Sequence, residues 1–139
     1  MARPRNSARP ATVGVAIAAP ALRRSVVDVL ARSGRYEAFP FQRSDIAAGI
    51  WPRQAYAAIV ATPGAFRASL GRRVRRRAGA PVILVVRENA LLREKEALAA
   101  ADAFVLAERL ETLPSIVVLS AYRLSIVPGS GRGRARGKK

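Results

Sequence analysis

Residues 81–86, PVILVV, form the clearest predicted strand, because a continuous apolar run suits a strand that is buried on both faces. Other short apolar segments lie on either side of it. Residues 13–19, VGVAIAA, are small and apolar on both faces, and residues 55–61, AYAAIVA, have the same character. Shorter strands are predicted at residues 36–41 and 103–106. The sequence therefore predicts five strands.

Helical patterns separate these strands. The predicted helices cover residues 21–33, 45–51, 65–78, 89–101 and 112–124. Strand and helix thus alternate five times along the chain, which predicts an α/β fold with a parallel sheet covered by helices on both faces. In such a fold, a functional site is expected beyond the carboxyl ends of the strands.

Local signals indicate where several helices begin and end. Gly34 stands where a helix C-terminal glycine is expected. Ser44 is predicted to cap the second helix, and Thr112 to open the last one. The pair Pro63-Gly64 predicts a turn between the third strand and the third helix.

Length and composition exclude several classes of protein. The 139 residues suit one domain, and half of them are apolar, which is enough for a sizeable core. The chain has no cysteine and no histidine, so disulfides, thiolate chemistry and the commonest metal ligand and general base are absent. No apolar run is long enough to span a bilayer, and no signal-peptide core follows the basic N-terminus. A cytoplasmic protein that is not an enzyme, without cofactor, metal or small-molecule substrate, is expected.

The formal net charge of +16 is unevenly distributed. Residues 1–9 and 132–139 carry eight basic residues and no acid, and the predicted helix at 65–78 carries many arginines and no acid either. One interpretation is solubility combined with a general bias towards arginine. The other is contact with an anion, most often nucleic acid. The candidate nucleic-acid contacts are Arg72, Arg73, Arg75, Arg76, Arg77, Arg132, Arg134, Arg136, Lys138 and Lys139.

Four segments resemble the receiver domain of bacterial response regulators, especially those of the LuxR type (NarL-like). Residues 18–24, AAPALRR, are similar to the family's first acidic pair and helix start, and residues 81–86 to its fourth strand. Residues 101–107, ADAFVLA, resemble the segment that leads to the family's lysine, and residues 124–128 resemble the entry to an inter-domain linker. The resemblance implies a flavodoxin-like, doubly wound five-stranded parallel sheet in the order 2-1-3-4-5.

The chain departs from the family at every position that carries its chemistry. The acidic pair is replaced by Ala18 and Ala19, the phosphoacceptor aspartate by Ala61, the hydroxyl residue by Val86 and the lysine by Ala107. Carboxylates are required there to hold Mg²⁺ and to accept a phosphoryl group, and alanine does neither. We therefore expect a degenerate phosphorylation pocket.

Two functions follow as hypotheses. The first is a phosphorylation-independent pseudo-receiver that acts as a protein-interaction module in signalling or transcriptional regulation. Its expected interaction face includes Phe104, Leu106 and Arg109, and its partner is a regulatory protein or a second copy in a constitutive homodimer. The alternative is a non-specific nucleic-acid-binding protein that uses the arginine-rich helix and the basic tails.

The expected domain organisation has three parts. Residues 1–11 and 129–139 are predicted to be disordered basic tails, because segments of this composition bury little apolar surface. Residues 12–128 are predicted to form the receiver-like domain. A LuxR-type regulator places a helix-turn-helix domain after the position of Pro128, where this chain has 11 residues. Whether such a domain has been lost, lies outside a fragment or is not needed stays open.

Overall fold

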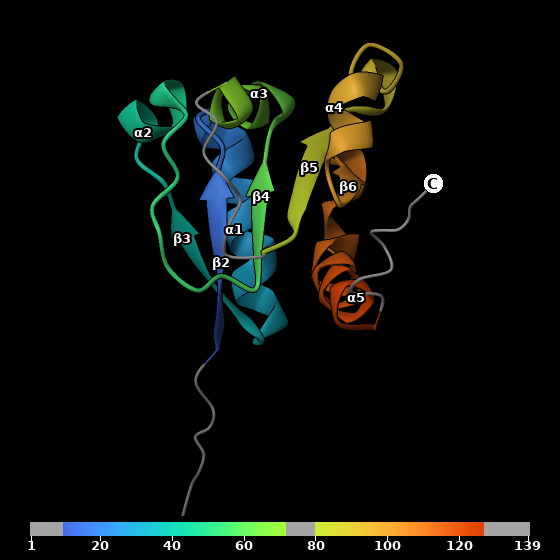
Figure 1. The fold of residues 1–139 in the computed structure, drawn as a ribbon. Helices are drawn as coiled ribbons and strands as arrows, with labels where there is room; N and C mark the ends of the chain where they lie inside the picture. Colours follow the sequence, from blue (N-terminus) through green and yellow to red (C-terminus); the bar gives the residue numbers. More distant parts are fainter. Residues whose placement is uncertain (1–9, 72–79, 127–139) are drawn as a thin grey trace, which may run out of the picture.

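The computed structural model describes residues 10–71 and 80–126, and their strands form one parallel sheet (Figure 1). The strands are β2 (Ala11–Ala16), β3 (Tyr36–Pro40), β4 (Ala58–Ala61), β5 (Val82–Val86) and β6 (Ala103–Leu106). Their order across the sheet is β3-β2-β4-β5-β6, and every neighbouring pair is parallel. The predicted order 2-1-3-4-5 and the predicted flavodoxin-like α/β class are confirmed.

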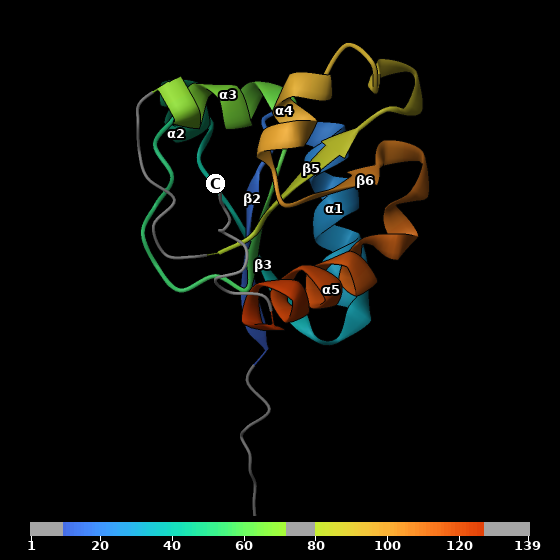
Figure 2. The ribbon, with the colours of Figure 1, turned by 45° about the vertical axis from the view of Figure 1, so that its right-hand side comes forward.

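Helices cover both faces of this sheet. They are α1 (Pro20–Ser33), α2 (Arg43–Ala48), α3 (Pro63–Gly71), α4 (Lys95–Ala100) and α5 (Leu113–Ile126), with two 3₁₀ segments, η1 (Glu88–Ala90) and η2 (Ala107–Thr112). The helices α1 and α5 share one face, while α2, α3 and α4 gather on the other, towards the carboxyl ends of the strands (Figure 2). The chain reverses its direction across the sheet once, after β3, and this places helices on both faces as in a doubly wound fold.

Successive side chains of each strand enter two separate apolar clusters. On the α1/α5 face, Val15, Val60 and Ile83 pack in one cluster with Leu30 and Val117 from the two helices. The residues that follow them in each strand, Ala16, Ala61 and Leu84, pack in the other cluster, on the α2/α3/α4 face. Seven apolar residues in the predicted strand segments are no more than 7% exposed: Val15, Ile17, Ile59, Val60, Ile83, Val85 and Val105.

Aromatic rings fill much of the cluster on the α2/α3/α4 face. The ring of Phe41 lies 5.7 Å from that of Tyr56 and 6.2 Å from that of Trp51, and Trp51 stacks on Phe66 at 6.4 Å. Gly14 of β2 lies beneath these rings. A Cβ at this position would stand 2.8 Å from Cζ of Phe41, so glycine allows the ring to contact the strand backbone.

Several predicted boundaries of the first half of the chain are wrong. The strand β2 ends at Ala16, not at Ala19, because Ala19 is the extended N-cap residue of α1. The predicted turn Pro63-Gly64 is the first turn of α3, in which Phe66 N donates to the carbonyl of Thr62 at 3.0 Å. Proline at the first helical position lacks only an N–H that would have had no partner there.

Two predicted caps are also wrong, while the predicted terminator of α1 is confirmed. The helix α2 begins at Arg43, so Ser44 lies inside it, and no side chain caps its start. Thr112 lies in η2, and its hydroxyl donates to the carbonyl of Arg109 at 2.8 Å instead of capping α5. Gly34 ends α1 in the left-handed conformation, with φ of 73°.

The predicted helix at residues 89–101 is interrupted. The 3₁₀ segment η1 is followed by a turn at residues 91–94, and only Lys95–Ala100 are α-helical. Leu91 and Leu98 nevertheless pack against the core, as the apolar spacing predicts. The chain therefore approaches α4 through a turn at the carboxyl end of β5.

Candidate functional site at the carboxyl edge of the sheet

Apolar residues occupy the carboxyl ends of the central strands. In the parallel register, Ala16 of β2 pairs with Ala61 of β4, and Ala61 pairs with Leu84 of β5. All three are 0% exposed and belong to the cluster under α2, α3 and α4. The centre of the edge at which parallel α/β sheets usually bind ligands is therefore closed apolar packing.

The five predicted pocket positions end or follow strands at the carboxyl edge, but their side chains have different environments. Ala61 and Val86 are buried and Ala18 is half-buried, and all three belong to the cluster on the α2/α3/α4 face. Ala19 is exposed at the start of α1. Ala107 packs against the cluster on the α1/α5 face. Three of the positions thus pack on one face of the sheet, while Ala19 faces solvent and Ala107 packs on the other face.

The three aspartates do not stand at the carboxyl ends of the strands. Asp28 is in α1, Asp45 is in α2, and Asp102 precedes β6 at the amino edge of the sheet. Within residues 10–71 and 80–126, no group of three or more His, Cys, Asp or Glu side chains comes together. The methyl groups of Ala61 and Val86 offer no ligand to Mg²⁺, which requires oxygen donors.

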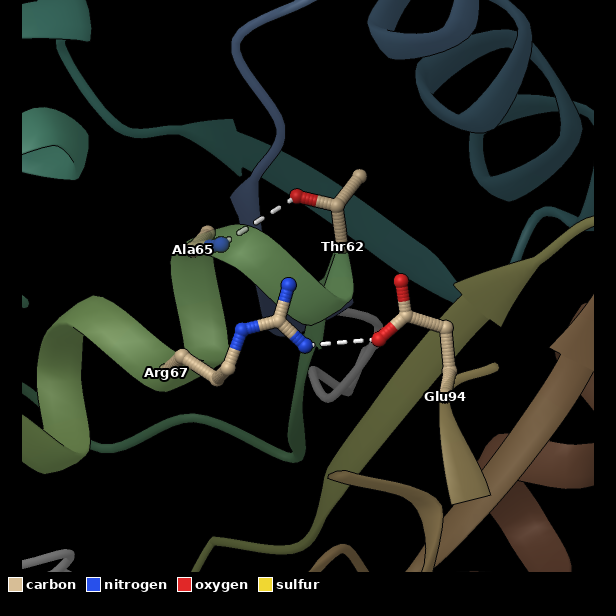
Figure 3. A network of polar contacts seen from close by, with 4 residues as sticks. All are labelled: Thr62, Ala65, Arg67 and Glu94. Atoms are coloured by element: carbon tan, nitrogen blue, oxygen red, sulfur yellow. Dashed lines mark hydrogen bonds and ion pairs between the residues drawn. The ribbon is translucent and has the colours of Figure 1, made fainter. Parts of the chain in front are cut away.

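One ion pair crosses the carboxyl edge (Figure 3). Nη1 of Arg67, from α3, lies 2.6 Å from Oε1 of Glu94, which precedes α4. The Glu94 side chain is 15% exposed and that of Arg67 is 57% exposed. The arginine-rich predicted helix at 65–78 contains no acid, but Arg67 finds an acidic partner on a neighbouring element, and Glu94 faces that element instead of solvent. Their 27-residue separation gives no local signal for this contact.

Polar contacts also fix the ends of β5 and β6. At the carboxyl edge, Oε1 of Glu108 accepts a hydrogen bond from the backbone N of Glu88 at 3.1 Å. At the amino edge, Oδ2 of Asp102 accepts from Val82 N at 2.8 Å, and Asp102 N donates to Val82 O at 3.0 Å. Asp102 therefore holds the start of β5 and has a structural role.

The predicted interaction residues have different environments. The side chain of Phe104 is 45% exposed, whereas Leu106 is half-buried against the core. Arg109 interrupts η2 with a non-helical backbone and pairs with Glu111 at 3.1 Å. The backbone N–H of Glu111, followed by the Arg109 guanidinium, holds the pKa of the Glu111 carboxyl below its ordinary value. Only Phe104 offers a large apolar surface to a partner.

Further exposed apolar side chains lie in the segments that precede and follow β6, which is an edge strand. Their exposed fractions are 84% for Leu92, 40% for Val118, 57% for Leu119 and 61% for Tyr122. Together with Phe104, they are called the β6-edge surface here, because α4, β6 and α5 follow this edge of the molecule (Figure 1). Their sequence signal is helical spacing, since burying Leu113 and Val117 turns Val118 and Tyr122 outwards.

The predicted nucleic-acid contacts all fall outside the described residues: Arg72, Arg73, Arg75, Arg76 and Arg77 between α3 and β5, and Arg132, Arg134, Arg136, Lys138 and Lys139 after α5. In the parts of the chain that the structure describes, the helices are too short or too polar to cross a membrane.

Comparison with known proteins identifies the fold. No family model matches the chain, and no significant match is found among curated proteins. The receiver domain of the sensor histidine kinase PA1611 from Pseudomonas aeruginosa PAO1 is similar, with a TM-score of 0.58 and 18% identity over 82% of this chain and 99% of that chain. Full-length FixJ from B. japonicum is also similar, with a TM-score of 0.60 and 16% identity over 84% of this chain and 61% of that chain.

A sensor protein from Polaromonas sp. JS666 is similar too, with a TM-score of 0.57 and 18% identity over 83% of this chain and 94% of that chain. The chain has the receiver-domain fold. These identities are low, so the likeness shows the arrangement of the backbone alone.

Proposed function

We propose that this chain is a pseudo-receiver that acts in signalling or transcriptional regulation as a protein-interaction module, without phosphorylation. The observation that carries the proposal is Ala61. It stands at the end of the central strand β4, where the receiver resemblance expects the phosphoacceptor, and it is fully buried beside Ala16. A receiver fold with a closed apolar centre retains its surfaces but has no carboxylate there to modify.

The contrast with one structural neighbour supports this proposal. The PA1611 receiver domain was solved with a magnesium ion coordinated in its active-site cleft. The corresponding edge here has Ala18, Ala61 and Val86 in an apolar cluster. Mg²⁺ keeps a tightly held shell of oxygen ligands, so an apolar edge offers nothing to replace its bound water.

A phosphorylation assay tests this part of the proposal. The full chain is incubated with Mg²⁺ and acetyl phosphate, and the intact mass is measured. We expect no added phosphoryl group and no saturable Mg²⁺ binding by calorimetry. A receiver domain from another protein that is known to accept a phosphoryl group from acetyl phosphate, treated in parallel, verifies the reagents. An aspartyl phosphate at Asp28, Asp45 or Asp102 would overturn the proposal.

The β6-edge surface is the proposed place of contact, and a second copy of the chain is the proposed partner. Aromatic and aliphatic side chains at the centre of an interface contribute most of the binding energy. Phe104, Leu119 and Tyr122 supply such groups next to the edge strand. Because no phosphorylation event is needed, the dimer is constitutive.

Sedimentation at several protein concentrations tests the dimer. We expect a monomer–dimer equilibrium that Leu119→Glu and Phe104→Glu shift strongly towards monomer, because each buries a charge in an apolar contact. Ile50→Glu is the matched control, since Ile50 is 42% exposed but follows α2, away from β6. A wild-type chain that stays monomeric at high concentration, or variants that dimerise as well as wild type, would contradict this contact.

The net charge of +16 favours a second candidate function, which is non-specific binding to nucleic acid. The proposed contacts are the cluster at 72–77 and the tail at 132–139. Affinity that arises from counterion release falls steeply with salt and depends little on base sequence. A salt titration of binding to two unrelated DNA duplexes tests this, with Arg72, Arg73, Arg75, Arg76 and Arg77 changed to alanine as the variant. No binding at low salt would eliminate the candidate.

A further inference from the structure

The helix α4 is too short to hold its own position. It has six residues, Lys95–Ala100, and Ala97 is its buried residue. An isolated helix of this length is not stable in water, because few hydrogen bonds compensate the cost of nucleation. Its place beside the β6-edge surface must therefore be fixed by contacts with other elements.

Glu94, which precedes α4, makes a contact of this kind with α3. Its backbone N donates to Ala90 O at 3.0 Å, and its backbone carbonyl accepts from Leu98 N at 3.0 Å. These bonds link η1 to the first turn of α4. Its side chain reaches out of this segment to Arg67 of α3 at 2.6 Å (Figure 3). Glu94 thus contacts three elements of the fold, which are α3, η1 and α4.

The burial of the pair increases the effect of losing it. The Glu94 side chain is only 15% exposed, so much of its hydration is lost in the fold. Without Arg67, a carboxylate at this position would lack a charged partner and would favour conformations that return it to water. The other ion pair in the described part of the chain, Arg109–Glu111, is 65% and 68% exposed and joins neighbours in sequence.

We propose that the Arg67–Glu94 ion pair is a latch that fixes residues 91–100 against α3 and thereby positions the α4 side of the β6-edge surface. At this edge of the sheet, where the resemblance implies a phosphorylation pocket without its carboxylates, a contact between two side chains of the chain itself determines the position of α4. The effect on partner binding rests on the proposed function, whereas the latch itself is a property of the fold.

Hydrogen exchange measured by mass spectrometry tests the latch on the full chain. In Glu94→Gln and Arg67→Gln, we expect amides of residues 91–100 to exchange about two- to fivefold faster, and amides of β2 and β4 to remain unchanged. The double variant Arg67→Glu/Glu94→Arg should restore protection, because it reverses both charges and keeps the pair. Arg109→Gln, which removes the exposed pair, is the matched control and should leave residues 91–100 unaffected.

Equal exchange at residues 91–100 in all five proteins would overturn the latch. So would faster exchange spread over the whole chain, which would make the ion pair a general contribution to stability. Association is then measured on the same proteins. We expect weaker self-association in Glu94→Gln and Arg67→Gln and recovery in the charge-reversed double variant. If the wild-type chain does not associate, the proposed function fails, while the exchange data still decide on the latch.

Discussion

The two faces of the sheet are covered in different ways. On one face, α1 and α5 each span 14 residues, and aliphatic side chains such as Leu30 and Val117 pack on the strands. On the other face, α2 and α4 have six residues each and α3 has nine, and aromatic rings fill the space between them. The first face is held by apolar contacts along whole helices. The second depends on rings, one close glycine and individual polar contacts.

This difference separates a general way of covering a sheet from one that depends on individual residues of this chain. Long amphipathic helices on a parallel sheet are a general solution to burying its face. The short helices lie over the carboxyl edge, where Ala16 and Ala61 meet under apolar cover. The apolar packing at this edge therefore depends on the second face, whereas the first face has an aliphatic core.

The largest effect is expected for Leu30→Ala on the α1/α5 face. Leu30 is 0% exposed, so the substitution leaves a cavity and should cost about 2–5 kcal/mol of unfolding free energy. Leu98→Ala on the other face removes the same atoms from a half-buried side chain and should cost less. Urea denaturation of both variants measures the difference. Equal losses would indicate that the two faces are packed equally tightly.

A smaller effect is expected for Gly14→Ala. The new methyl group would stand 2.8 Å from the buried ring of Phe41 and 3.1 Å from that of Tyr56, so the rings must move. Overpacking of this kind costs about 1–3 kcal/mol. Gly64→Ala is the matched control, because a Cβ at Gly64 meets nothing within 4 Å. Thermal unfolding distinguishes the two variants, and a neutral Gly14→Ala would show that the ring cluster is loosely packed.

Sequence patterns were sufficient for the elements whose signals are local. The continuous apolar run at 81–86 and the glycine at 34 correctly predicted a strand and a helix end. The five-fold alternation of strand and helix correctly predicted a parallel sheet, and the resemblance to receiver domains supplied the strand order. The short helices were less predictable, because tertiary contacts override weak propensity there.

The candidate site was predicted only in part, because local signals show which residues stand there but not how they pack. The replacement of acidic residues at 18, 19 and 61 is visible in the sequence alone. Whether alanine at 61 leaves an open cavity or closed packing depends on side chains from several elements, and the structure places this alanine in closed packing. The Arg67–Glu94 pair joins residues 27 positions apart, so only the folded chain shows it.

The next largest effect on stability is expected at the amino edge of the sheet, where Asp102 lies. Asp102→Ala removes the carboxylate that accepts from Val82 N, and Val82 is only 3% exposed. A buried N–H without a partner costs about 1–3 kcal/mol. Asp102→Asn retains an acceptor oxygen and should lose less. Denaturant unfolding measures both variants, and an unchanged Asp102→Ala would mean that water replaces the carboxylate at this position.

The smallest effect is expected for Tyr56, and it appears only at alkaline pH. Burial raises the pKa of the Tyr56 hydroxyl from 10.0 to about 12, and the hydroxyl donates to Pro52 O at 2.8 Å. The neutral phenol is therefore favoured in the folded chain. Between these two pKa values the unfolded chain loses this proton while the folded chain keeps it, so stability falls as pH rises through that range. Below pH 10, this contribution is fully present.

Tyr56→Phe isolates this contribution from the other groups that titrate at alkaline pH. The variant loses one hydrogen bond, worth about 0.5–1.5 kcal/mol at neutral pH, but keeps the ring against Phe41. Its stability should decline less steeply than that of wild type between pH 10 and about 12. Denaturant unfolding at several pH values, with phenolate absorbance followed in parallel, measures both slopes. Identical slopes would place the Tyr56 hydroxyl in solvent and would weaken the description of this face as one held by packed rings.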